Sequence, residues 1–293
     1  MTQTKTIEGS SRSAAIATMC IGVVMLVIND ATVKELVTRY DPLQILFVRS
    51  LIALPLVVAL VCLIDSPKAL RSSRLRVHAL RGLLGVATAY ALILSLRSLP
   101  LAEATALVFA SPIVVAVLSA PLLKEYIGWA RATAVAAGFI GVLIIVRPGA
   151  ATFQAASLLA FLAAILYALV MLSARWIDKR DNVWTMMFYM TLFSGVFTVF
   201  TVFTPWPTPM LTDLWLFLCT ALAGTLGLAL ISQAFRMAPA AVVAPYDYTA
   251  LIWASLLGWL IWGVVPEIWT YVGAAVIIAA GIYLIASQPE PEA

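Results

Sequence analysis

The chain has 293 residues, of which 63% are hydrophobic and only 11% are charged, with a mean hydropathy of +1.03. This composition excludes an ordinary water-soluble domain, because the chain lacks the polar residues to cover its surface. The net charge of +4 and the sequence pI near 9.0 do not indicate nucleic-acid binding, because the basic residues stand in short loops between apolar runs. We therefore expect a protein embedded in a lipid bilayer.

Apolar runs of the length that a membrane-spanning helix needs, roughly 20 residues, recur along the chain. Only helices or closed barrels satisfy the backbone in lipid, and runs this continuous indicate helices. The expected fold class is all-α, with ten transmembrane helices at about 14–37, 42–64, 77–97, 101–122, 127–147, 153–175, 183–204, 212–236, 239–263 and 266–287. The first run follows Lys5 and Arg12 as a secretory signal does, but we expect it to stay as an anchor, because the repeat described below needs it.

The basic residues divide unequally between the two sides of the membrane. If the N-terminus is cytoplasmic, four of them lie outside, namely Lys34, Arg39, Arg97 and Arg147. Thirteen lie inside, namely Lys5, Arg12, Lys68, Arg71, Arg74, Arg76, Arg81, Lys124, Arg131, Arg175, Lys179, Arg180 and Arg236. Positive charge accumulates on the cytoplasmic side, so this division predicts a multi-pass inner-membrane protein with both termini in the cytoplasm.

An internal repeat emerges when the chain is compared with itself at an offset of roughly 140 residues, here called the repeat offset. The offset aligns Arg97 with Arg236, Pro100 with Pro239, Gly85 with Gly224, Trp129 with Trp269, and Gly141 with Gly281. It predicts two related halves of five spans each, residues 1–150 and 151–293. Because five is odd, the second half enters the membrane from the opposite side, and two inverted repeats of this kind are typical of secondary transporters.

Four segments carry a family resemblance: "NDATVK" from Asn29 to Lys34, "FVRSLIALP" with Arg49, "ATALVFASPIVVAVLSAPLLKE" with Pro112 and Glu125, and "GFIGVLIIVRPG". Their order across ten spans resembles the drug/metabolite transporter superfamily, specifically its EamA type, whose members include YddG-like exporters of aromatic amino acids. The resemblance implies a carrier for small metabolites without ATPase parts. It also implies that spans 1–4 and 6–9 surround a central cavity, with spans 5 and 10 outside.

The sequence departs from one branch of that superfamily. The small multidrug relatives couple drug export to protons through a glutamate deep in the first helix, whereas "AAIATMCIGVVMLVIND" here has no acid before Asp30. Proton-driven export of cationic drugs is therefore not expected. The resemblance favours export of amino acids, including aromatic ones; the alternative is a carrier for another metabolite or drug class of the same superfamily.

The segment "APYDYTALIW" places Asp247 between Tyr246 and Tyr248 inside the ninth span. A charged aspartate facing lipid near the membrane centre costs about 2.5–3.5 kcal/mol. We therefore expect Asp247 either to line the central cavity with the two tyrosines or to serve structurally, by capping a broken helix or bonding a neighbouring one. Pro245 has no backbone N–H, so it frees a carbonyl one turn earlier that a ligand could reach.

Other polar residues inside the spans are further candidates for the site. Arg49 is a candidate counter-ion, with Glu103 and Asp247 as equally open partners. Asp30 and Lys34 stand four apart with the acid first, so we expect them to pair with each other. The remaining substrate-binding candidates are Asn29, Tyr90, Tyr167, Tyr189 and Gln233, although a tyrosine can equally serve packing. Candidates for helix contact, bending or gating are Pro55, Pro112, Pro245, Gly85 and Gly224.

The residue pattern does not suggest catalysis or metal binding. The single histidine, His78, stands among arginines at a helix start, and Asp247 has no intramembrane aspartate partner for a protease-like dyad. The three cysteines lie in apolar runs at spacings that do not suit zinc. We therefore expect no enzyme, no metal and no other cofactor. Scattered single polar residues disfavour a channel, and we predict a monomeric carrier whose partners are a small-molecule substrate and the lipid bilayer.

Overall fold

The protein is described here as a computed structural model that covers residues 2–64, 70–123, 129–148, 153–177, 181–238 and 243–286. Within these ranges every regular element is a helix. Some landmarks of the sequence lie outside the described residues: the boundary between the halves at 150/151, Glu125, Pro239, and the basic residues Lys68, Lys124, Lys179 and Arg180.

The predicted spans correspond to these helices, in chain order: α1 (Thr2–Leu36), α2 (Pro42–Ile64), α3 (Leu75–Leu96), α4 (Leu101–Val108) with α5 (Ser111–Leu123), α6 (Trp129–Val146), α7 (Ala155–Ser173), α8 (Val183–Thr198), α9 (Leu214–Met237), α11 (Ala250–Trp262) and α12 (Ile268–Ala286). Short 3-10 helices extend four of them: η2 (Ala174–Trp176) after α7, η3 (Val199–Phe203) after α8, η4 (Leu211–Asp213) before α9 and η5 (Ala244–Thr249) before α11.

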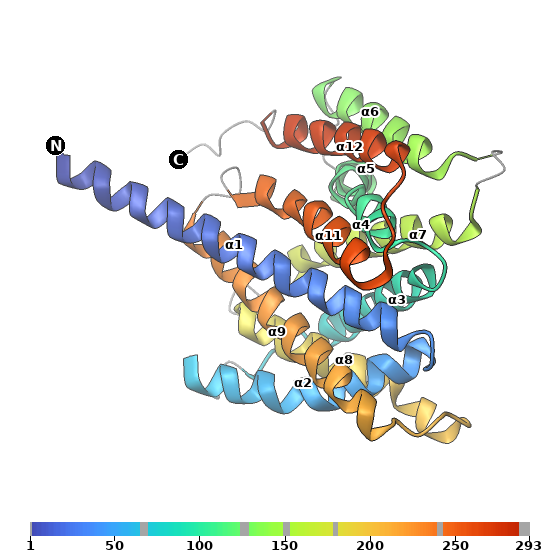
Figure 1. Cartoon of the computed structure of the whole chain (residues 1–293). Helices are drawn as coiled ribbons and strands as arrows, with labels where there is room; N and C mark the ends of the chain where they lie inside the picture. The colour runs from blue at the N-terminus through green and yellow to red at the C-terminus, as the bar shows by residue number, and fades with distance from the viewer. Residues whose placement is uncertain are drawn as a thin grey trace.

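Seven spans within the described residues are long and apolar enough to cross a membrane. Shorter apolar helices at 132–146 and 268–283, within α6 and α12, supply two more, and η5 with α11 supplies the tenth. The all-α membrane fold with ten spans is thus confirmed. α1 begins and α12 ends on the same side of the bundle (Figure 1), which we call the N-terminal side, and the other face is called the opposite side.

The expectation of a continuous helix over 101–122 is wrong. α4 ends at Val108, the chain turns through Phe109 and Ala110, and α5 starts at Ser111. Pro112 is the physical reason, because it has no N–H to donate to the carbonyl of Val108, one turn earlier. The fourth span therefore crosses the membrane as two half-helices.

Packing between the helices follows the inverted repeat. α1 packs along α9, which pairs span 1 with span 8, and α3 packs along α7, which pairs span 3 with span 6. The repeat relates each span to the one five places away, so it converts the first of these pairs into the second. The contacts of α2 with α9 and of α3 with α8 exchange in the same way, whereas α2 with α8, α4 with α11 and α6 with α12 each map onto themselves. The two halves are therefore related by a pseudo-two-fold axis in the membrane plane.

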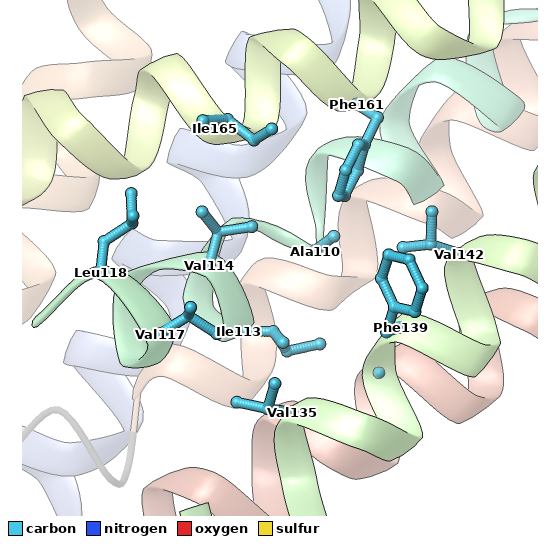
Figure 2. A pocket seen from close by; sticks show the side chains of 11 residues that line it. Ala110, Ile113, Val114, Val117, Leu118, Val135, Phe139, Val142, Phe161 and Ile165 are labelled. Atoms are coloured by element: carbon cyan, nitrogen blue, oxygen red, sulfur yellow. The ribbon is translucent and has the colours of Figure 1, made fainter. Parts of the chain in front are cut away.

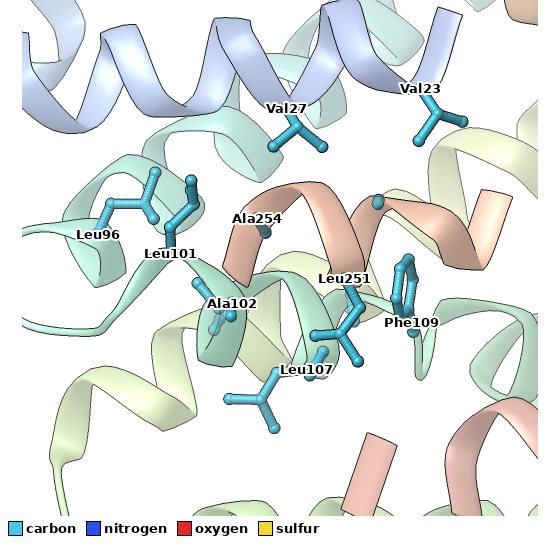
Figure 3. Packing of buried hydrophobic residues seen from close by; sticks show 14 of the residues in the cluster. Val23, Val27, Leu96, Leu101, Ala102, Leu107, Phe109, Leu251 and Ala254 are labelled. Carbon is cyan, nitrogen blue, oxygen red and sulfur yellow. The ribbon is translucent and has the colours of Figure 1, made fainter. Parts of the chain in front are cut away.

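Two of the three self-paired sets of helices lie at opposite edges of the molecule. In Figure 1, α6 and α12 lie side by side at one edge, and α2 and α8 lie at the other. Between them runs the main core, in which α1, α4 and α11 bury apolar side chains such as Val27, Leu107 and Leu251 against one another (Figure 3). The fifth and tenth spans thus stand outside the other eight, as the family resemblance implies.

A cavity of about 300 Å³ lies beside the break in the fourth span, between α5, α6 and α7 (Figure 2). Its lining is entirely apolar: Ala110, Ile113, Val114, Val117, Leu118, Val135, Gly138, Phe139, Val142, Phe161 and Ile165. A cavity without a polar group offers nothing to orient a charged metabolite, so the candidate site is not there.

Candidate functional site

The interrupted fourth span packs against the ninth span, in which the 3-10 helix η5 continues directly into α11. Their second helices start at Ser111 and Ala250, which the repeat offset aligns with each other, as it aligns Phe109 with Tyr248. The rings of Phe109 and Tyr248 pack edge to face, with centroids 5.1 Å apart and planes at 86°. The break in the fourth span and the equivalent 3-10 segment of the ninth span therefore lie against each other at the pseudo-two-fold axis. Interrupted spans are tolerated in a membrane where they are buried in protein or line a cavity.

Asp247 lies in η5, within the ninth span, and its side chain is exposed. The surrounding protein desolvates its carboxyl group, yet the side chain is exposed. It interacts electrostatically with the adjacent Tyr248 and with Tyr167 of α7, whose side chain is 38% exposed. η5 packs on α1 and α11, whereas α7 packs on α3, α4 and α5. Asp247 and Tyr167 thus interact although they belong to different parts of the bundle, and Asp247 has no hydrogen bond or ion pair within the described part of the chain.

The tyrosines beside Asp247 differ in environment. Tyr246 is half-buried against the main core. Tyr248 is buried, and its hydroxyl lies so close to α12 that a Cβ atom on Gly281 would collide with it. Tyr248 therefore packs toward α12, while Asp247 is the exposed residue of the three.

A second polar group, here called the Arg49 cluster, lies where α1, α2 and α9 meet and consists of Asn29, Asp30, Arg49, Thr220 and Gly224. The hydroxyl of Thr220 donates to Oδ1 of Asn29 over 2.6 Å, and Nδ2 of Asn29 donates to Oδ1 of Asp30 over 2.8 Å. Asn29 and Thr220 are buried, whereas Arg49 is half-buried. The amide of Asn29 is thus fixed at both ends.

Gly224 allows the guanidinium of Arg49 to approach α9. A Cβ atom at this position would lie 2.5 Å from Nη2 of Arg49 and 2.9 Å from Oδ1 of Asn29. Its counterpart in the first half, Gly85, faces Met190 of α8, whose Cε would lie 2.6 Å from a Cβ atom. Both glycines are therefore points of close approach between spans, with a charged neighbour in only one case.

Neither expected partner pairs with Arg49. Its electrostatic partner is Asp30, and no hydrogen bond or ion pair involves its guanidinium within the described ranges. Glu103 lies instead beside Ser157, whose hydroxyl donates to it over 3.3 Å, and near Arg147 and Glu267, which form an ion pair on the opposite side.

The expected ion pair between Asp30 and Lys34 is wrong. Nζ of Lys34 donates to the carbonyls of Leu96 and Leu99, over 2.7 and 2.6 Å, and lies 5.5 Å from the ring centroid of Trp262. The reason is that carbonyls at the end of α3 and in the turn after it have no partner within the helix. A nearby ammonium group satisfies them, and the aromatic ring adds a cation–π contact.

A polar clasp joins the halves on the N-terminal side. Oδ2 of Asp181 accepts a hydrogen bond from the hydroxyl of Ser72 over 2.6 Å and lies 2.9 Å from Nε2 of His78. The His78 ring stacks on Tyr189 at 4.6 Å, and the hydroxyl of Tyr189 donates to the carbonyl of Leu70 over 2.9 Å. Tyr189, a candidate for substrate binding, is therefore engaged in this clasp.

A matching clasp joins the halves on the opposite side. Asp213 accepts hydrogen bonds from the hydroxyl of Tyr40 over 2.7 Å and from Nη1 of Arg39 over 2.6 Å. Burial, followed by the hydrogen bond to Asp213, raises the pKa of the Tyr40 phenol. The repeat relates the loop around Tyr40 to the loop before α8, and the start of α9 to the start of α3. The two clasps are thus counterparts at opposite faces.

The remaining candidates are dispersed. Tyr90 is half-buried in the middle of α3, and Gln233 is exposed near the end of α9. Pro55 is exposed and does not interrupt α2, which runs through it. No cluster of three or more potential metal ligands occurs among the described residues.

Sequence reasoning missed Arg81, Thr220, and the acids of the two clasps. Arg81 of α3 is counted above with the loop residues, but it is buried and donates to the carbonyl of Val170 over 2.7 Å and to the hydroxyl of Ser173 over 3.2 Å. The repeat offset aligns Arg81 with Thr220, so the repeat was the signal that could have singled them out.

Comparison with known proteins identifies this arrangement. The model of the EamA-like transporter family matches the chain twice, over residues 13–147 and 154–287. The chain belongs to the EamA-like transporter family. The two matches cover most of the chain and correspond to its two five-span halves, so this family member is built from a duplicated unit. Its fold agrees with a solved crystal structure of 18% sequence identity, with a TM-score of 0.62 over 92% of this chain and 96% of that chain.

The curated relatives of this EamA-like protein are transporters. An S-adenosylmethionine uptake transporter of Rickettsia bellii is 31% identical over 264 residues, 89% of each chain. A riboflavin transporter of Vibrio cholerae is 33% identical over 63% of this chain and 62% of its own. A pseudopaline exporter of Pseudomonas aeruginosa is 26% identical over 88% and 90%. The EamA-like protein is therefore a secondary transporter of small metabolites and not an enzyme.

Proposed function

We propose that this protein is an alternating-access carrier for a small metabolite that combines a cationic or zwitterionic group with an aromatic ring, with S-adenosylmethionine as the first candidate. The observation that carries the proposal is the exposed carboxylate of Asp247, which no described residue pairs with and which interacts electrostatically with the exposed Tyr167. A carboxylate attracts a cation, and tyrosine rings stack on an aromatic group or a cation.

S-Adenosylmethionine fits this chemistry because it carries a sulfonium cation, an amino-acid group and an adenine ring. The relative that transports it aligns over 89% of both chains. We propose uptake as the direction, since that relative is an uptake transporter. Asp247, Tyr246 and Tyr167 are then the proposed contacts of the cation and the ring.

Export of aromatic amino acids, as in YddG-like exporters, is the second candidate. It is favoured by the same tyrosines together with the half-buried Arg49, since these suit a zwitterion with an aromatic side chain. The two candidates differ in the size of the ring system and in the direction of net transport.

In this proposal the halves are residues 1–150 and 151–293, and the protein acts as a monomer in the inner membrane. Both termini are cytoplasmic, as the distribution of Lys and Arg favours. The N-terminal side is then the cytoplasmic side. Reporter fusions at each terminus test this orientation, and a periplasmic signal from either fusion contradicts it.

Transport by the purified protein in liposomes is the decisive experiment. Labelled S-adenosylmethionine, riboflavin and tryptophan are supplied outside or loaded inside, and influx and efflux are measured for each. We expect saturable S-adenosylmethionine uptake, which Asp247→Asn reduces at least roughly tenfold because a hydrogen bond or ion pair to a charged group is lost. Asp41→Asn is the matched control, because Asp41 is exposed in a loop and an asparagine accepts its hydrogen bond from Leu43 equally well. Net tryptophan efflux without S-adenosylmethionine flux favours the second candidate instead.

A further inference from the structure

We infer that the Arg49 cluster is the receptor for a carboxylate group of the transported metabolite, with Arg49 as the residue that binds it. The inference rests on the proposed carrier function and adds a specificity-determining residue to it. Asp247 supplies the negative pole of the site, and Arg49 supplies the positive one.

The guanidinium of Arg49 is available to a ligand. Arg49 lies within the second span and is half-buried, and no described residue forms a hydrogen bond or ion pair with it. The contrast with Arg39, Arg81 and Arg147 is direct, because each of these makes a hydrogen bond to a protein oxygen. A guanidinium presents a planar fork of N–H donors that matches a carboxylate.

Asp30 is the acid that could neutralise Arg49, and a hydrogen bond from Asn29 restrains the carboxylate of Asp30. Nδ2 of Asn29 donates to Asp30 over 2.8 Å, while Oδ1 of Asn29 is held by the Thr220 hydroxyl at 2.6 Å. Among the described residues, Asp30 therefore contributes electrostatically to Arg49 without forming a direct ion pair with it. A nearby negative charge makes a half-buried guanidinium tolerable within a membrane span, and the N–H groups stay open for a substrate.

Gly224 provides the space on the other flank. Nη2 of Arg49 would be 2.5 Å from a Cβ atom at position 224, so any larger residue on α9 displaces the guanidinium. The equivalent glycine of the first half, Gly85, accommodates the apolar end of Met190. The two equivalent glycines thus each leave space for a neighbouring side chain. The space at Gly224 is filled by the guanidinium of Arg49, which no described residue pairs with.

The two poles lie at similar depths in the membrane. Gly224 is roughly three turns into α9, and Asp247 is roughly four turns before the end of α11, both counted from the opposite side. At the helical rises of α and 3-10 helices, the poles differ in depth by on the order of 10 Å or less. In this proposal, a molecule with a carboxylate and a cation a few bonds apart contacts both poles. The amino-acid part of S-adenosylmethionine is of this class.

The test compares paired substrates that differ only in the carboxylate. S-Adenosylmethionine is paired with its decarboxylated form, and tryptophan with tryptamine, in proteoliposomes of wild type, Arg49→Gln, Arg49→Lys, Gly224→Ala and Asp30→Asn. Arg97→Gln is the control, because Arg97 is exposed at a turn. Thermal unfolding of each purified variant, with and without the same compounds, reports folding and binding separately from transport.

We expect wild type to prefer the carboxylate member of a pair and Arg49→Gln to lose that preference, by at least roughly tenfold, while still transporting the decarboxylated compound. Arg49→Lys keeps part of the preference. Gly224→Ala reduces it, since the guanidinium is displaced, and Asp30→Asn increases it, since a competing charge is removed. Arg97→Gln leaves it unchanged.

Two results overturn the inference. The first is an Arg49→Gln protein that folds and retains the wild-type preference for the carboxylate compound. The second is a wild-type carrier that transports the decarboxylated compounds as well as the parents. If instead wild type transports neither member of either pair, and neither member raises its unfolding temperature, the proposed function itself fails. The two failures are thereby distinguished.

Discussion

Replacing Gly22 with alanine tests whether the contact between α1 and α9 holds the Arg49 cluster together. A Cβ atom at Gly22 would lie 3.0 Å from the carbonyl oxygen of Gly227 and 2.9 Å from Cγ1 of Ile231. A Cβ atom at Gly227 would likewise lie 3.0 Å from the carbonyl oxygen of Gly22. Because backbone atoms are involved, the clash is relieved only by moving one helix away from the other.

The expected cost is set by two opposing effects. Overpacking of a close interface destabilises by about 1–3 kcal/mol. Replacing glycine by alanine inside a helix stabilises by about 0.8–1.0 kcal/mol. Gly195→Ala is the matched control, since a Cβ atom there would lie an ordinary 3.5 Å from Cβ of Ser50. The two variants share the propensity gain, so their difference in unfolding free energy is the clash itself, about 1–3 kcal/mol.

A functional effect accompanies the structural one. Asn29 lies about two helical turns after Gly22, and Thr220 about two turns before Gly227, so each pair shares a helix face. Moving α9 away from α1 therefore stretches the 2.6 Å hydrogen bond from Thr220 to Asn29. Unfolding of detergent-solubilised protein and carboxylate-dependent transport are measured for both variants. If Gly22→Ala unfolds at the same denaturant concentration as Gly195→Ala and transports as well, the reasoning about this interface is refuted.

Three further predictions concern single contacts. Burial raises the pKa of Tyr40 above the usual value of about 10. The neutral phenol therefore stabilises the fold below that pH, and this contribution disappears as pH rises through the raised pKa. The unfolding free energy measured between about pH 8 and 11 should fall more steeply in wild type than in Tyr40→Phe, and equal slopes would contradict the role of the hydrogen bond to Asp213. Lys34→Met should lower the unfolding free energy by on the order of 2 kcal/mol, because the end of α3 loses two charge-assisted hydrogen bonds, and an unchanged free energy in chemical denaturation would show that water replaces them. Gly281→Ala should displace the Tyr248 ring, because a Cβ atom there would collide with its hydroxyl; a transport rate and stability equal to wild type would show that this packing can adjust freely.

The fold was predictable because its main determinants are local and additive. Each span can be recognised in the sequence from the length and hydropathy of its apolar run, and the common repeat offset reveals the duplication. The interruption near Phe109 was not predicted, although Pro112 marked it, because a proline within an apolar run is compatible with both a kink and a break. The structure shows a break, since α4 ends at Val108 and α5 starts at Ser111, and Phe109 packs against its repeat counterpart Tyr248.

The site was only partly predictable, because its contacts join distant parts of the chain. The spacing of Asp30 and Lys34 favours a local ion pair, but the chain also brings the carbonyls of Leu96 and Leu99 within reach of the lysine. Similarly, Tyr40 meets Asp213 across 173 residues, a pairing that no local pattern encodes. Residue type identifies which side chains need a partner in the membrane, whereas topology decides which partner each one finds.

The duplication also explains why one chain can present two unlike poles to a single substrate. Inverted halves create every niche twice, as the pairs Gly85 and Gly224, and Arg81 and Thr220, illustrate. If both copies had kept the same side chains, the central space would be chemically two-fold symmetric and a polar substrate could enter in two equivalent orientations. Instead, the niche at Gly224 holds the guanidinium of Arg49, which no described residue pairs with, while the niche at its counterpart Gly85 holds the apolar end of Met190. Symmetric architecture therefore supports movement between two similar states, and divergence of a few polar residues gives the bound molecule one preferred direction.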